Sequence, residues 1–456
     1  MDSLSGTLAR WICDLDLADI PAAVVDDARL HLTDTLGVMV AGSVSETGRA
    51  VRAAALRIGP GDAARILGFG DRAAAAGAAI ANGTLAHVHD YDDTHSEARI
   101  HISAPVVTAA LAAGQTARAN GRTVLTAIIA GSELTARLGA MTPGAFHNHG
   151  YHPTGVLGTI GAAFTASKVM GLAPPQMQNA IGIAASQAAG IAESFSDGTW
   201  TKRLHAGWAA HCGVAAATLA DSGFTGPVKA LDGARGLFNA HLGKADHPYA
   251  RVTEGLGTQW LCTGSSCKPY PCGHLIHAYI EGVYGLREEA LLNAREVKTI
   301  TCPVAPWVMP MVCEPRADKV APTTEAQAKI SLYYCIAAAM LLNRIDLAAF
   351  TPQAIADPRI AELAQKIVCT PDPDAPEDQT KGWLIVHTVD GRKLETVLTH
   401  PLGSPRNPMT ADDVARKFTD NMAFANLKDN AAQVQDLVAR IEALPSIDTL
   451  VGACCP

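Results

Sequence analysis

The sequence is poor in aromatic and in charged residues. Of its 456 residues, 5% are aromatic and 18% are charged, whereas 48% are hydrophobic. Alanine and glycine are plentiful, and such small residues favour helices that pack with little space between them. A chain of this length predicts two or three domains.

Long runs of one kind of residue are also missing. No Lys/Arg run suggests a nucleic-acid partner, and the formal net charge is −8. No window holds the roughly 18 strongly apolar residues that a membrane helix needs. Residues 1–20 lack the basic and apolar regions of a secretory signal. We therefore expect a cytoplasmic protein with no membrane or nucleic-acid partner, whose eleven cysteines are reduced thiols.

Several catalytic motifs are absent. The sequence contains no P-loop, no Gly-x-Gly-x-x-Gly after a strand, no Gly-x-Ser-x-Gly and no His-Glu-x-x-His. Cys262, Cys267 and Cys272 do not have the Cys-x-x-Cys spacing of zinc sites. These absences argue against nucleotide, dinucleotide and serine-hydrolase chemistry. They leave cofactor-independent chemistry on a small anion, with histidine and lysine as the reacting groups.

Apolar periodicity predicts helices through most of residues 1–260. The clearest expected helices cover residues 21–42, 103–119, 121–140, 155–172, a stretch from 174, and 204–226. From about residue 297 the pattern alternates, which predicts a strand and then a hairpin over 381–400 with a type I′ turn at Asp390-Gly391. A helix is expected between them, over 324–344. Thr410 and Asp413 form a capping box that predicts a return to helix.

Titratable residues are concentrated between residues 81 and 106. This stretch of 26 residues holds three aspartates and four histidines. Three interpretations remain open. The cluster could bind a divalent metal ion, although no named metal motif matches. One histidine could transfer a proton while an aspartate fixes its tautomer or holds a lysine. Alternatively, these side chains could merely cap helices and face water.

A second polar segment, residues 145–155, leads into the expected helix over 155–172. His152 and Thr154 lie where the backbone N–H groups and the helix dipole favour an anion. His147 and His149 could instead form a His-x-His metal pair. A structural role for these histidines is an equally simple interpretation.

Two lysines mark further candidate sites. Lys202, Arg203 and His205 crowd the start of a helix rich in small residues, where cations oppose the helix dipole and a bound anion would relieve that cost. Lys268 is followed by two prolines that stiffen its backbone and suits the binding of a carboxylate. The alternatives are a solvated basic turn for the first and an ordinary linker for the second.

Several segments together resemble the MmgE/PrpD family, which includes 2-methylcitrate dehydratase, cis-aconitate decarboxylase and iminodisuccinate epimerase. In chain order they are NGTLAHVHDYDDTH, IHISAPVVTAALA, YHPTGVLGTIGAAFTASKVMGL, NAIGIAASQAAG, TKRLHAGWAAHCGV, GFTGP, KPYPCGHLIHA and NPMTADDVARKF. The resemblance implies a mainly α fold, with a discontinuous helical domain over 1–264 and 405–456 and an α+β lid domain over 265–404. It also implies a homodimer without metal or organic cofactor.

The resemblance further implies a set of site residues. The catalytic ones are His101, Lys202, Asp90 and Lys268, and the substrate-binding ones are Thr94, His152 and Tyr334. In this scheme the lysines and His152 hold the carboxylates of the substrate. His101 moves a proton and is oriented by Asp90, while Thr94 and Tyr334 donate hydrogen bonds to a carboxylate or hydroxyl group.

The function that follows is a lyase acting on a small di- or tricarboxylate. It would dehydrate or decarboxylate a citrate- or aconitate-type acid through a carbanion-like intermediate. An epimerase of a dicarboxylate such as iminodisuccinate would use the same proton chemistry. A non-catalytic anion-binding protein on the same fold is the third possibility.

Overall fold

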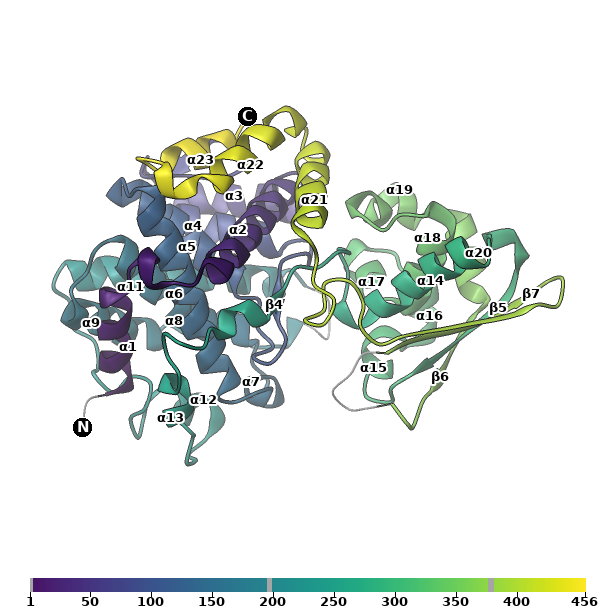
Figure 1. Cartoon of the computed structure of the whole chain (residues 1–456), viewed down its shortest axis with the longest axis horizontal. Helices are drawn as coiled ribbons and strands as arrows, with labels where there is room; N and C mark the ends of the chain where they lie inside the picture. Colours follow the sequence, from purple (N-terminus) through teal and green to yellow (C-terminus); the bar gives the residue numbers. More distant parts are fainter. Residues whose placement is uncertain (1–2, 195–198, 376–380) are drawn as a thin grey trace. The chain divides into compact units, whose positions relative to one another are not determined.

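The computed structural model describes residues 3–194, 199–375 and 381–456, and it divides into two compact units (Figure 1). Unit 1 comprises Met1–Cys267 and Thr410–Pro456, and unit 2 comprises Lys268–Met409. Each unit has its own hydrophobic core. The fold is mainly α with small sheets, as the sequence predicts.

Unit 1 is built from helices. They are α1 (Leu4–Asp14), α2 (Ala22–Ser43), α3 (Glu46–Ile58), α4 (Ala75–His87), α5 (Ser103–Ala117), α6 (Gly121–Ala140), α7 (Ala145–Asn148), α8 (Pro153–Val169), α9 (Pro174–Ala185), α11 (Thr201–Asp221), α12 (Leu237–Leu242), α13 (Ala250–Thr253), α21 (Ala411–Phe424), α22 (Ala431–Ala439) and α23 (Asp448–Ala453). The expected helices are confirmed, although the last begins at 201 and ends at 221. The predicted capping box is present at the start of α21.

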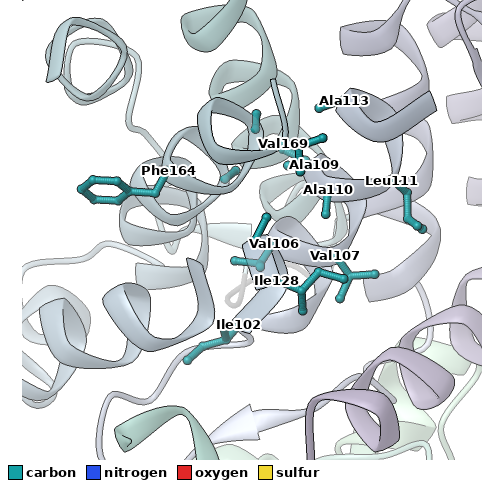
Figure 2. Close-up of a cluster of buried hydrophobic side chains, with 14 of the residues drawn as sticks. Ile102, Val106, Val107, Ala109, Ala110, Leu111, Ala113, Ile128, Phe164 and Val169 are labelled. Atoms are coloured by element: carbon teal, nitrogen blue, oxygen red, sulfur yellow. The ribbon is translucent and has the colours of Figure 1, made fainter. Parts of the chain in front are cut away.

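The core of unit 1 surrounds α5. Every residue of this helix from Ser103 to Gln115 is buried, so it has no solvated face. It packs against α4, α6, α8 and α11. Figure 2 shows part of this core, with Val106 and Leu111 of α5, Ile128 of α6 and Phe164 of α8 among its side chains.

Small residues allow α4 and α11 to approach closely. A Cβ atom on Gly207 of α11 would lie 2.3 Å from the carbonyl oxygen of Ile80, and one on Gly83 of α4 would lie 2.7 Å from the Cα of Gly207. The last residue of α4, His87, and the first turns of α11 are therefore neighbours.

Short strands interrupt the helices of unit 1, which the sequence did not predict. They form two antiparallel pairs, β1 (Ala64–Arg65) with β2 (Arg72–Ala73), and β3 (Thr94–His95) with β4 (Ser265–Ser266). The second pair ties the segment that carries Thr94 to the end of the first part of unit 1. Two-residue strands leave no periodic pattern that a sequence could reveal.

Unit 2 combines a four-stranded sheet with helices. The strands are β5 (Val297–Val304), β6 (Ile367–Pro371), β7 (Gly382–Thr388) and β8 (Lys393–Leu398), and the helices are α14 (His277–Glu289), α15 (Met309–Val312), α16 (Arg316–Val320), α17 (Glu325–Lys329), α18 (Leu332–Leu342), α19 (Pro352–Ile355) and α20 (Pro358–Gln365). The strand order is β6-β5-β7-β8, with β5 and β6 parallel and the other pairs antiparallel. Helix α14 packs on β7 and β8, and α18 packs against α14 (Figure 1).

Two sequence predictions in unit 2 need correction. The hairpin exists, but its turn is not type I′, because only Gly391 of the two predicted turn residues has a positive φ, of 91°. Thr388 and Arg392 close a longer loop in which glycine takes the left-handed position. The expected helix over 324–344 is two helices, because the hydroxyl of Ser331 accepts a hydrogen bond from the Tyr334 N–H and begins α18 there.

The described part of the chain contains no helix with the length and apolar character required to cross a bilayer.

The close approach of α4 and α11 yields a stability prediction. We expect Gly207→Ala to lower the free energy of unfolding by about 1–3 kcal/mol, because the added methyl group must displace backbone atoms of α4. Gly452→Ala in α23 is the matched control, since nothing lies within 4 Å of its added Cβ. Urea denaturation of both variants checks the prediction, and equal stabilities would contradict it.

Candidate functional site

Four histidine side chains of unit 1 converge from different segments. They are His87 at the end of α4, His101 two residues before α5, His152 at the N-cap of α8, and His205 in the second turn of α11. The ring centroids of His87 and His101 are 4.5 Å apart, those of His87 and His152 5.7 Å, and those of His152 and His205 5.2 Å. We call these four residues the imidazole cluster.

A buried carboxylate, Asp92, lies against two of these rings. The Nδ1 atom of His87 lies 2.9 Å from Oδ2 of Asp92, and Nδ1 of His101 lies 3.4 Å from the same oxygen. The side chain of Asp92 is fully buried. A carboxylate in this position stabilises positive charge on either imidazole.

The backbone fixes the tautomer of His101. Its Nδ1 atom lies 2.9 Å from the carbonyl oxygen of Asp93, which can only accept a hydrogen bond. Nδ1 therefore carries the hydrogen, and Nε2 is the nitrogen that can take up or release a proton. The hydroxyl of Thr94 lies 3.4 Å from Nδ1, and the N–H of His101 donates to the hydroxyl of Thr154 at 3.2 Å.

Lys202 forms an ion pair with Asp90 rather than standing alone at the start of α11. The Nζ–Oδ1 distance is 3.0 Å, and both side chains are partly exposed. The carboxylate offsets the unfavourable position of a cation near a helix N-terminus. Asp90 itself has a φ of 52°, a left-handed conformation that aspartate tolerates better than most residues. A carboxylate oxygen of Asp90 also lies within 4.8 Å of a ring nitrogen of His101, and the role of Asp90 in orienting that ring stays a prediction.

A second, deeper set of polar groups holds Asp93. Its carboxylate accepts hydrogen bonds from the N–H and the hydroxyl of Ser103, at 3.1 and 2.6 Å. Its Oδ2 also lies 2.9 Å from Nδ1 of His31 in α2. Although burial opposes both changes, this pairing lowers the pKa of Asp93, while Cys267 and Asp93 raise the pKa of His31 well above its ordinary value. The carbonyl oxygen that orients His101 therefore belongs to Asp93, whose side chain is held in place by Ser103 and His31.

Helix α21, near the C-terminus, contacts the loop that contains residues 90–93. Lys417 of α21 lies 2.6 Å from the carboxylate of Asp34, donates to the carbonyl oxygen of Tyr91 at 2.8 Å, and lies 3.8 Å from the centroid of the Tyr91 ring. Tyr91 stands between Asp90 and Asp92, so this contact restrains the loop that carries both aspartates.

Burial and neighbouring positive charge keep two imidazoles of the cluster neutral. Burial, with the charges of His87, Lys202 and His101, lowers the pKa of His152 well below its ordinary value. Burial, with the charges of His87 and Lys202, lowers the pKa of His205 to about 4. The Nδ1 atoms of these two residues are 3.0 Å apart, so that one ring donates a hydrogen bond to the other. The site thus concentrates groups that would gain from a nearby anion.

The residue types also match those of a metal site. Ligand atoms of His87, His101 and His152 lie within 4.8 Å of one another, as do those of His87, Asp90, Asp92 and His101. Imidazole and carboxylate groups are ordinary ligands of zinc and other divalent ions. The absence of a metal or organic cofactor therefore stays a prediction of the family resemblance.

Five of the seven predicted site residues lie in this part of unit 1: Asp90, Thr94, His101, His152 and Lys202. The other two, Lys268 and Tyr334, belong to unit 2. Lys268 is buried, and Tyr334 is buried with its hydroxyl donating to the carbonyl oxygen of Ala349 at 2.6 Å. Contact of these two with a substrate stays a prediction.

Two histidines of the 81–106 stretch have structural partners. Nε2 of His95 lies 2.7 Å from the carbonyl oxygen of Leu261, and its Nδ1 accepts from the Ala98 N–H at 3.0 Å. Nε2 of His89 lies 3.3 Å from the carbonyl oxygen of Ala41. Both rings are buried and hold backbone segments together, whereas the third interpretation expected side chains that cap helices and face water.

Sequence reasoning gave no specific role to His87, Asp92 or His205, and it missed His31. A signal for His31 exists, because Asp27, His31 and Asp34 share one face of a helix that is otherwise apolar on that side. Polar residues spaced in this way in a buried helix indicate an internal polar partner.

Comparison with known proteins identifies the family of this chain. Residues 6–250 match the MmgE/PrpD N-terminal domain, and residues 270–443 match the MmgE/PrpD C-terminal domain. The chain belongs to the MmgE/PrpD family. It is similar to cis-aconitate decarboxylase of Aspergillus terreus, with 25% identity over 98% of this chain and 95% of the relative. The mouse cis-aconitate decarboxylase is 27% identical over 99% of this chain and 93% of the relative.

The suppressed protonation of His205 predicts a pH effect on stability. An unfolded histidine has a pKa of 6.5, whereas the folded one has a pKa of about 4. Between these values the unfolded chain binds more protons, so stability falls as the pH is lowered from 6.5 towards 4, by at most about 1.4 kcal/mol per pH unit for one proton. Thermal unfolding of wild type and His205→Gln between pH 7.5 and 4.5 checks this. The stability advantage of wild type should shrink as the pH falls, and a constant difference would contradict the prediction.

Proposed function

We propose that this protein is a lyase that dehydrates or decarboxylates a small di- or tricarboxylate through a carbanion-like intermediate. The observation that carries the proposal is the imidazole cluster beside Lys202, which joins several groups able to bind an anion with an oriented proton-transfer group. Relatives named cis-aconitate decarboxylase support a lyase in this family.

Recognition of the carboxylates is the first step of the proposed mechanism. Lys202 forms an ion pair with Asp90, and His152 stands at the N-terminus of the 17-residue helix α8, where the helix dipole favours an anion. A bound carboxylate would raise the depressed pKa of His152 and His205 and turn them into charged partners. The family resemblance adds Lys268 and Tyr334 of unit 2 as substrate-binding residues.

Proton transfer is the second step. The reaction breaks a bond at a carbon next to a carboxylate, and negative charge develops on that carbon and its carboxylate. Lys202 and His152 would stabilise this charge. Nε2 of His101 would supply or remove the proton, with Nδ1 held by the Asp93 carbonyl and the resulting positive charge stabilised by Asp92.

A substrate panel tests the proposal. Citrate, 2-methylcitrate, cis-aconitate and iminodisuccinate are incubated with the protein in heavy water and followed by proton NMR. Formation of an alkene from a hydroxy acid, or loss of carbon dioxide from cis-aconitate, is the expected result. Inversion at a C–H carbon without loss of a group would identify the alternative epimerase, and the absence of turnover on every acid would contradict both.

The same assay tests the role of His101. We expect His101→Ala to lower turnover at least about a hundredfold, within the usual range for a general acid or base. His387→Ala, which removes an exposed imidazole from β7, is the matched control and should retain full turnover. Circular dichroism verifies that both variants are folded, and an unchanged rate in a folded His101→Ala variant would remove His101 from the mechanism. A homodimer stays a prediction of the family resemblance.

A further inference from the structure

Three cysteines of unit 2 form a cluster apart from the residues discussed above. Cys302 lies on β5 and Cys369 on the neighbouring strand β6, while Cys313 directly follows α15. Cys302 and Cys369 are register partners in the parallel β5–β6 pair. Cys302 and Cys313 are buried, and Cys369 is partly exposed.

The register places Cys302 and Cys369 at a spacing suitable for a disulfide. Neighbouring strands lie about 4.8 Å apart, and side chains of register partners point to the same face of the sheet. Disulfides need Cα atoms roughly 4.4–6.8 Å apart, so a bond between these residues requires little backbone movement.

The surroundings of Cys369 favour its thiolate. The thiols of Cys302 and Cys313 and the hydroxyl of Tyr333 are neighbours of its sulfur, and Arg316 adds positive charge nearby. The neighbouring Cys302 and Cys313 hold the pKa of Cys369 far below that of an ordinary thiol, although burial opposes this change. Burial and Cys369 raise the pKa of Cys302, and Cys369 and burial raise that of Cys313. A partly exposed thiolate with two neighbouring thiols has the features of an oxidation-sensitive cysteine.

We propose that Cys369, Cys302 and Cys313 form a peroxide-sensitive thiol site, in which Cys369 is oxidised first and then forms a disulfide with one of the other two. The Cys369 sulfur attacks a peroxide oxygen, so that an S–O bond forms and the O–O bond breaks. The product is a sulfenic acid, and hydroxide leaves and is protonated to water. The second sulfur then attacks the sulfenic sulfur, and an S–S bond forms as the S–O bond breaks. The hydroxyl group departs with the thiol proton as water. Two thiols thus supply the two electrons that reduce the peroxide. This site is independent of the proposed reaction.

Peptide mapping of the full-length protein tests the proposal. The folded protein is treated with hydrogen peroxide, remaining thiols are alkylated, and the digest is analysed by mass spectrometry. The expected result is a peptide pair that joins Cys369 to Cys302 or Cys313. Oxidation of Cys369 to a sulfinic acid without any such bond would overturn the disulfide step.

Unit 2 contains its own control for proximity. Cys272 and Cys335 are both buried in the core of unit 2, and burial, together with the neighbouring Cys272, raises the pKa of Cys335 well above its ordinary value. We expect Cys369 to react at least about tenfold faster than this pair, because the thiolate is the reacting form. Equal rates would show that closeness alone governs oxidation and would overturn the proposal. In Cys369→Ser, Cys302 and Cys313 should stay reduced in the folded protein at the same peroxide exposure.

Discussion

The site depends on bringing buried imidazoles, a lysine and two carboxylates together in a small volume. His87 and His101 share Asp92, Lys202 pairs with Asp90, and the pKa values of His152 and His205 are lowered because burial and their positive neighbours leave little room for further charge. Burying such groups together is costly, because desolvation of polar and charged groups destabilises a fold. A multiply charged organic anion would offset this cost.

The helical framework makes this crowding possible. Contacts such as Gly83 against Gly207 bring α4 and α11 closer than larger side chains would allow. The end of α4 and the start of α11 then deliver His87 and His205 to the same place. The C-terminal return contributes through Lys417, which holds the loop around Tyr91 although it lies 326 residues further along the chain. The discontinuity of unit 1 is therefore part of how the site is supported.

Much of this could be predicted from the sequence, because local patterns carry it. The helix periods, the start of α8 after His152 and the density of titratable residues between 81 and 106 are all local. The pairing of each aspartate with a particular cation cannot be predicted from local patterns, because the partners are far apart in the sequence. Asp90 pairs with Lys202, which lies 112 residues further along the chain. Its neighbours Asp92 and Asp93 pair with His87 and His31, and Asp90 itself has a left-handed backbone conformation. The two-residue strands and the loop closed by Thr388 and Arg392 likewise depend on tertiary contacts that a single sequence does not display.

The central claim is that His152 and His205, which are kept neutral by burial and by nearby positive charges, are arranged to bind a polycarboxylate. Calorimetric titration with tricarballylate, an unreactive tricarboxylate, tests it most directly when performed at pH 7 in two buffers of different ionisation enthalpy. The anion should bind with net uptake of protons, because it raises the depressed pKa values of His152 and His205. Absence of binding, or binding without proton uptake, would contradict the account.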